Sequence, residues 1–278
     1  TTGSVVVNVG GVDSNGQTFT VTTSGPPSAT PELVQQLLVQ SNQNFEDGNG
    51  FINMLPNPVL AGNCVILSIT YARKPGRTVA ITDNVGTNNW ALVAGPFDSS
   101  NGSFSRAIYV SLNTKAGTQK ITVTFDEPLF DFQAVASEWH NVATAGALDA
   151  HTAAGAHAPN VAAGTMTTTQ AGDLVYQYAL DTGWGVAMEG NSFTGYTAGA
   201  GFTLLAADRR IAVVHQYAIQ SAAGPINPTF TTTAGTGDSF NTLAIALKAA
   251  AAGTAPDPAA MRIVTTYHTR VNAGSPRL

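Results

Sequence analysis

The sequence predicts an all-β protein: an antiparallel β-sandwich or jelly roll with an extra N-terminal hairpin and a C-terminal orphan strand. β-Branched and aromatic residues recur in short runs that turn residues separate at short spacing. Residues 121–125 alternate between apolar side chains and threonine, which is typical of a half-buried strand. Only 10% of the residues are charged, far below the roughly 25% of ordinary soluble proteins, as in many secreted β proteins.

The first 23 residues are predicted to form a hairpin. Two β-branched runs, Ser4–Val9 and Thr18–Thr22, are joined by residues 13–16, and the Asn15-Gly16 pair is a strong hairpin signal. Residues 24–32, rich in Pro, Ser and Thr, are expected to be a linker.

Residues 32–39 allow two interpretations. Thr30 could cap a helix that has Pro31 in its first turn. The same segment could equally lead into a strand through residues 37–41. The sequence does not decide between them.

A single β-sandwich domain is predicted over residues 33–249. Its expected strands are Val65–Tyr71, Val79–Asp83, Trp90–Gly95, Ser105–Val110, Lys120–Phe125, Phe132–Trp139, Asp173–Tyr178, Thr203–Ala206, Ile211–Tyr217 and Thr242–Leu247. Many short strands with Gly- and Pro-containing turns between them indicate a sandwich rather than βαβ units.

Residues 250–260 form a second predicted linker, and residues 261–278 hold one more strand. The strand comprises Arg262, Ile263, Val264, Thr265, Thr266, Tyr267 and His268. A lone strand leaves its backbone amides and carbonyls without partners. We therefore expect this strand to be donated to a neighbouring subunit or domain.

Two resemblances can be tied to residues. The string from Gly3 to Val21, with the pattern V-x-V-G-G-x-x-S-N-G-x-x-F-x-V, resembles the closing hairpin of an IPT/TIG (immunoglobulin-like) domain. The central region is similar to β-sandwich modules of large secreted bacterial proteins. It shares with them residues 81–84 before Trp90, the Glu138-Trp139 strand, the Leu148-Asp149 turn and residues 168–174. These resemblances imply fold and secretion, and they imply no activity.

The two ends suggest two hypotheses about organisation. Residues 38–44 and 263–269 resemble each other as opening strands, so the chain could be a piece of a repetitive array. Alternatively, the terminal strand could complete a sheet in the next subunit, which is β-strand addition. A head-to-tail contact of that kind is heterologous and gives an open filament.

Charge and composition exclude several function classes. The net charge of −5 and the lack of a basic stripe argue against nucleic-acid binding, and Arg73, Lys74 and Arg77 are expected to be a solvated turn. No apolar stretch is long enough to insert into a membrane. Cys64 is the single cysteine and is expected to lie in the core. No cofactor is predicted.

Metal and catalytic sites find weak support. His140, His151 and His157, with Asp149, match no zinc signature, and the last two are expected in an exposed Gly/Ala loop. Calcium could bind at Asp83-Asn84 or at Asp98, but neither position has a loop dense in oxygen ligands.

The carboxylates that could serve a glycosidase are Asp126-Glu127, Glu138 and Asp181. Adjacent acids at a strand end are, however, usually turn residues. His215 is expected on a solvent face or in a hydrogen bond.

Aromatic residues in loops give one candidate binding surface. Trp184 and Tyr196, both beside glycines, could stack on a sugar, whereas Trp90 and Trp139 lie in strand patterns and are expected in the core. We therefore expect a non-enzymatic extracellular or cell-surface protein, structural or adhesive, that self-associates or joins neighbouring domains. A carbohydrate-binding module is the second hypothesis, and a glycoside hydrolase is the third.

Overall fold

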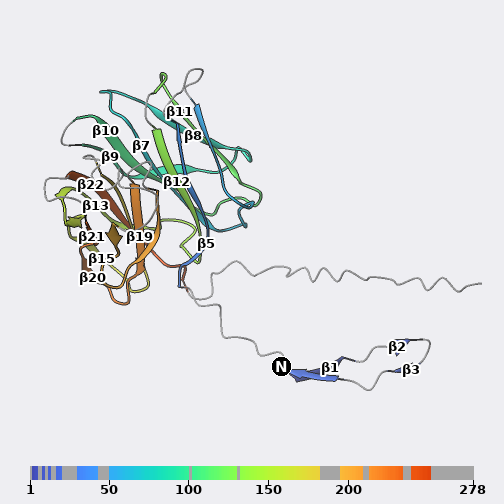
Figure 1. Cartoon of the computed structure of the whole chain (residues 1–278). Coiled ribbons are helices and arrows are strands. Elements are labelled where there is room, and N and C mark those ends of the chain that lie inside the picture. The colour runs from blue at the N-terminus through green and yellow to red at the C-terminus, as the bar shows by residue number, and fades with distance from the viewer. Residues whose placement is uncertain are drawn as a thin grey trace, which may run out of the picture.

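A computed structural model of the chain confirms the all-β, antiparallel architecture (Figure 1). It describes residues 2–5, 8–9, 12–13, 17–20, 30–42, 50–99, 102–129, 132–181, 195–208, 213–233 and 239–251. No helix occurs among these residues. Accordingly, the described part of the chain contains no helix that could cross a membrane. The segment left open between helix and strand is strand β5, Glu32–Asn42.

Eight strands form a first sandwich. They are β5, β6 (Gly50–Met54), β7 (Cys64–Ala72), β8 (Val79–Asp83), β9 (Trp90–Asp98), β10 (Phe104–Ser111), β11 (Lys120–Phe125) and β12 (Phe132–His140). One sheet has the order β5-β12-β7-β10-β9, and the sheet that covers it has the order β6-β11-β8. Each of these strands after β6 was predicted from the sequence, to within three residues at either end.

A second sandwich follows directly along the chain. Its strands are β13 (Leu148–His157), β14 (Asn160–Ala162), β15 (Met166–Thr168), β16 (Leu174–Asp181), β17 (Tyr196–Thr197), β18 (Thr203–Asp208), β19 (Val213–Ile219), β20 (Gly224–Ile226), β21 (Thr229–Thr232) and β22 (Ser239–Leu247). Eight of them form one continuous sheet of order β17-β21-β14-β13-β22-β16-β19-β18, and β15 pairs with β20. The range predicted as a single sandwich thus contains two.

The two sandwiches are structural repeats. The order β5-β12-β7-β10-β9 in the first corresponds, strand for strand, to β13-β22-β16-β19-β18 in the second, and β6-β11-β8 corresponds to β14-β21-β17. A detail of the backbone repeats as well. The Gly62 amide donates to Thr114 and the Thr114 amide donates to Asn63, just as Gly172 donates to Gln220 and Gln220 to Asp173. Gly62 and Gly172 have φ of 85° and 88°, a conformation that favours glycine.

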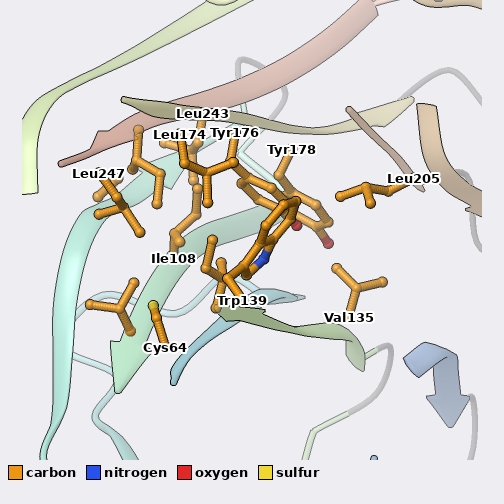
Figure 2. Packing of buried hydrophobic residues seen from close by; sticks show 14 of the residues in the cluster. Cys64, Ile108, Val135, Trp139, Leu174, Tyr176, Tyr178, Leu205, Leu243 and Leu247 are labelled. Carbon is orange, nitrogen blue, oxygen red and sulfur yellow. The ribbon is translucent and has the colours of Figure 1, made fainter. Parts of the chain in front are cut away.

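The largest core cluster joins the two sandwiches face to face (Figure 2). Trp139 of β12 is fully buried, and its ring meets Tyr217 of β19 edge to face at a centroid distance of 4.9 Å. Two hydrogen bonds cross the same layer, from Ser68 to the Tyr176 hydroxyl (3.1 Å) and between Thr70 and the Tyr178 hydroxyl (2.8 Å). One shared core therefore holds both repeats.

Smaller clusters cover the outer faces of the central sheets. One lies between the two sheets of the first sandwich, and two more lie under the curled sheet and the β15–β20 pair of the second. Strands β7, β12, β16 and β22 are consequently buried on both faces. This explains why apolar residues occur on both faces of these strands and do not simply alternate with polar ones.

The N-terminal hairpin is also present. Strand β1 (Thr2–Val5) pairs with β4 (Gln17–Thr20), and β2 (Asn8–Val9) pairs with β3 (Val12–Asp13). The register Val9↔Val12 means that the chain reverses between these two residues and not at Asn15-Gly16, as the sequence suggested. The predicted terminal strand, residues 261–278, lies outside the described residues.

Candidate functional site

The open edge of β5 is the most prominent unpaired backbone surface among the described residues. β5 is eleven residues long and lies at the end of its sheet, where it pairs with β12 and with no other described strand. The side chain of Val34 is 44% exposed there. Natural edge strands are usually short or contain lysine or proline. β5 is long and contains neither residue.

Both faces of β5 are held in place. The Gln35 amide group donates to Glu138 and to the backbone oxygen of Asn57 (2.9 Å), and it accepts from the Asn57 amide (2.8 Å). On the neighbouring position, Gln36 donates to the backbone oxygen of Leu205 in the second sandwich (3.1 Å). The first half of β5 is therefore held from both faces.

The second repeat treats the equivalent strand differently. β13 pairs with β22 on one side, and on the other side only its last residue, His157, pairs with Asn160 of β14. The sheet continues from β14 into β21 and β17. The first repeat has no such continuation, because β6 belongs to the covering sheet. Among the described strands, β5 therefore has no partner along its outer side, and β13 has one only at His157.

The two sandwiches together, residues 30–251, form a double sandwich. The chain enters and leaves it at the same place, beside the start of β5. The Asn141 side chain donates to the backbone oxygen of Thr30 (3.1 Å), and the Ala250 amide donates to the backbone oxygen of Asn141 (2.8 Å). A shallow cavity of about 390 Å³ lies between these segments; it is lined by Thr30, residues 170–172 and residues 249–251. Residues after 251 thus start close to the open edge.

The carboxylates considered for catalysis are engaged in structural contacts. Glu138 is fully buried and accepts from Gln35, from the Leu60 amide (2.9 Å) and from the Asn63 side chain (2.6 Å). Asp126 and Glu127 lie at a strand end as turn residues, where they pair with Arg77 and, for Glu127, with Lys74. The side chain of Asp181 lies outside the described ones.

The basic turn cluster is neutralised by acids. Arg73 pairs with Asp98, and Lys74 pairs with Glu127. The side chain of Arg77 is only 7% exposed, and its guanidinium lies 6.0 Å from the centre of the Phe125 ring. No basic stripe results from these three residues.

The histidines do not converge on a metal. His151 and His157 are exposed, and both lie in β13, not in a loop as predicted. At about 3.3 Å per strand residue they are roughly 20 Å apart. No group of three metal-ligating side chains occurs among the described residues. The loop prediction failed because alanine, glycine and threonine dominate β13, which carries little of the usual strand signal.

The two calcium candidates are turn and ion-pair residues. The Asp83 carboxylate accepts from the Val85 and Gly86 amides (both 2.9 Å) and from the side chains of Asn88 and Trp90 (3.0 and 2.9 Å). These hydrogen bonds outweigh the effect of burial and hold the pKa of Asp83 below its usual value. Asp98 accepts from Ser105 and from Arg73.

One of the two aromatic residues predicted to stack on a sugar is not available at the surface. Tyr196 is only 6% exposed, and its ring packs edge-on against Phe230 at 5.8 Å, so it lies in the core of the second sandwich. Trp184 lies outside the described residues. Trp139 is a core residue as expected, whereas Trp90 is half-buried and tied through its ring nitrogen to Asp83.

Sequence patterns did not indicate the polar residues that lie inside the shared core. Arg106 and His215 are both buried between the sandwiches, and burial lowers the pKa of each, for His215 to about 3. Among the described residues, none hydrogen-bonds to the buried Arg106 guanidinium. Strand alternation could have placed these residues on an inner face only if the second sandwich had been known to cover it.

The β5 edge and the adjoining chain exit are therefore the features that could carry a function, and they are built from backbone groups and not from reactive side chains. Comparisons of the chain with known protein families, with curated proteins and with solved structures found no match.

Proposed function

We propose that this chain is a non-enzymatic, extracellular structural or adhesive protein that assembles by β-strand addition. The open edge of β5 is the acceptor, and residues 262–268 of a neighbouring chain are the donor strand. One observation carries the proposal: an eleven-residue edge strand, without lysine or proline, that among the described strands pairs on one side only.

The physical argument rests on backbone hydrogen bonds. An added strand satisfies the outward N–H and C=O groups of β5, and its alternate side chains contact the exposed flank at Val34. The sequence of the donor, with Ile263, Val264 and Tyr267, has the β-branched and aromatic residues that favour strands.

The linker before the donor strand is long enough for this pairing. Residues 252–261 follow the chain exit beside Thr30, and ten residues span at most roughly 35 Å when extended. The donor can therefore reach a β5 edge on an adjacent molecule. Each chain then offers one donor and one acceptor, so that the contact is head to tail and generates an open filament.

The test compares two lysine substitutions. Val34→Lys places a charge on the acceptor edge, and Leu60→Lys places one at an apolar residue that is 61% exposed and lies outside the strands. We expect electron microscopy and sedimentation velocity to find filaments or concentration-dependent oligomers in the wild type and in L60K. V34K, and a chain that lacks residues 256–278, should associate at least about tenfold more weakly.

Monodisperse single particles of wild type at every concentration would contradict the proposal. Equal association of V34K and L60K would contradict the choice of β5. Circular dichroism of the variants confirms that the double sandwich is folded in each, so that a loss of association is not mistaken for unfolding.

A further inference from the structure

A lysine and two aspartates meet where the first and last strands of the second sandwich lie side by side. Leu148 of β13 pairs with Leu247 of β22, and a bulge in the register follows at Asp149. The Nζ of Lys248 lies 3.3 Å from Oδ1 of Asp149. Asp173, which precedes β16, is fully buried beside Asp149. The three side chains come from the two ends and the centre of the repeat.

The Asp149 carboxyl group is buried and held in place by hydrogen-bond donors. Its side chain is only 2% exposed. The backbone amide and the hydroxyl of Thr169 both donate to its oxygens, the hydroxyl to Oδ1 at 2.5 Å. Donors placed in this way stabilise the negative charge that develops on oxygen when a carbonyl carbon is attacked.

Asp173 supplies an acid next to the same carboxyl group. Burial and the neighbouring Asp149 raise the pKa of Asp173 to about 6, so that it retains a proton at higher pH than an ordinary aspartate does. Burial also raises the pKa of Asp149, but the hydrogen bonds from Thr169 outweigh it and hold the pKa near 2. The unreacted pair is therefore a Lys248–Asp149 ion pair with an acid beside it.

We propose that Lys248 and Asp149 form an intramolecular isopeptide bond, with Asp173 as the catalytic acid. The amine nitrogen of Lys248 attacks Cγ of Asp149, the new C–N bond forms, and one C–O bond breaks. One proton passes from the Lys248 ammonium to the Asp149 carboxylate, which leaves a neutral amine and a carboxylic acid for the attack. Asp173 then donates its proton to the departing hydroxyl, which leaves as water, and takes the second proton from the lysine nitrogen. In sum, an ammonium and a carboxylate become one amide and one molecule of water, with no oxidant, metal or cofactor.

The first repeat provides an internal comparison. His140 occupies the position of Lys248, because Trp139 and Leu247 pair with the equivalent residues Cys64 and Leu174. Asn63 likewise occupies the position of Asp173, and it contacts His140 at 2.9 Å. With neither an amine nor an acid, the first repeat cannot form this bond. The cross-link would join β13 to β22 covalently in the second repeat alone.

Mass spectrometry of the folded full chain tests the inference. We expect an intact mass that is lower than the sequence mass by one water molecule. A tryptic digest should contain a branched peptide that joins the segments of Asp149 and Lys248. The branched peptide separates this cross-link from loss of water at any other residue.

Three variants define the site. Lys248→Arg keeps the ion pair to Asp149 but lacks a nucleophilic amine, and it should show the full sequence mass. Asp173→Asn should lose the branched peptide, or reduce its yield at least about tenfold, because the acid is absent. Lys74→Arg, which alters the exposed Lys74–Glu127 ion pair, should leave the branched peptide unchanged.

An intact wild-type mass equal to the sequence mass, with separate Asp149 and Lys248 peptides, would overturn the inference and leave an ion pair only. A branched peptide of undiminished yield in Asp173→Asn would overturn the role of the acid. Neither outcome depends on strand addition at β5, since the measurement is made on single chains.

Discussion

His215 illustrates how the shared core holds a titratable group in its neutral form. It is buried in β19, and its Nδ1 lies 3.3 Å from the Tyr176 hydroxyl. Burial lowers its pKa from 6.5 to about 3, so the folded protein cannot accept a proton that the unfolded chain takes up below pH 6.5. The stability associated with neutral His215 is thus complete above pH 6.5. It falls as the pH drops towards 3, by about 1.4 kcal/mol per pH unit.

His215→Gln should remove this part of the acid sensitivity. Glutamine stays neutral and can still bond to Tyr176, so between pH 7.5 and 4.5 the variant should lose roughly 2–3 kcal/mol less unfolding free energy than the wild type does. Urea unfolding at the two pH values measures the difference. His151→Gln, at an exposed histidine of β13, is the control and should behave as the wild type. Identical pH dependence in all three proteins would refute the assignment.

Individual residues could be predicted from the sequence only where local pattern decides their surroundings. Cys64 lies in an apolar run and is a core residue, as expected. The sequence left His215 open between a solvent face and a hydrogen bond, and only the hydrogen bond is found. Tyr196 was expected in a loop because glycine precedes it, yet Phe230 from a distant strand covers its ring. Burial by a distant element has no local signature.

At the scale of elements, strands buried on both faces were the easiest to predict. β7, β12, β16 and β22 are rich in apolar residues on both faces, since each face is covered. β13 was missed because its alternating residues are alanine, glycine and threonine, and the short strands β14, β15 and β20 are three residues each. Such strands exist because their neighbours pair with them, and a single sequence does not reveal the pairing.

Trp139 should be the strongest single contact between the elements of the two repeats. It is fully buried in β12, donates its ring N–H to Ser137 (2.8 Å) and packs against Tyr217. Trp139→Ala should therefore lower the unfolding free energy by about 3–5 kcal/mol through the cavity that it leaves. Chemical denaturation measures the loss. The control is Leu92→Ala, at a residue of β9 that is 45% exposed, and it should change the unfolding free energy by less than about 0.5 kcal/mol. An equally small loss for Trp139→Ala would contradict the shared core.

At the scale of the whole molecule, two repeats with the same strand order share one core but differ at one edge. The duplication escaped sequence analysis because the repeats match in topology and in turn geometry but not in side chains. Gly62 and Gly172 are equivalent glycines, whereas Asn63 is equivalent to Asp173 and His140 to Lys248. The open edge of β5 is likewise a property of the assembled sheets. Sequence patterns indicated an unpaired donor strand and could not identify its acceptor.

Cysteine pairing between two chains tests strand addition at β5 most directly. One chain carries Val34→Cys and the other Thr265→Cys; the native Cys64 is 1% exposed and does not interfere. When the two chains are mixed and mildly oxidised, they should join into a covalent heterodimer. If the two cysteines are not directly opposite each other in the paired strands, a short bifunctional thiol cross-linker should join them instead. Leu60→Cys in place of Val34→Cys should give none. Failure of the Val34 and Thr265 chains to join, or a cross-link found only within single chains that carry both substitutions, would contradict assembly through this edge.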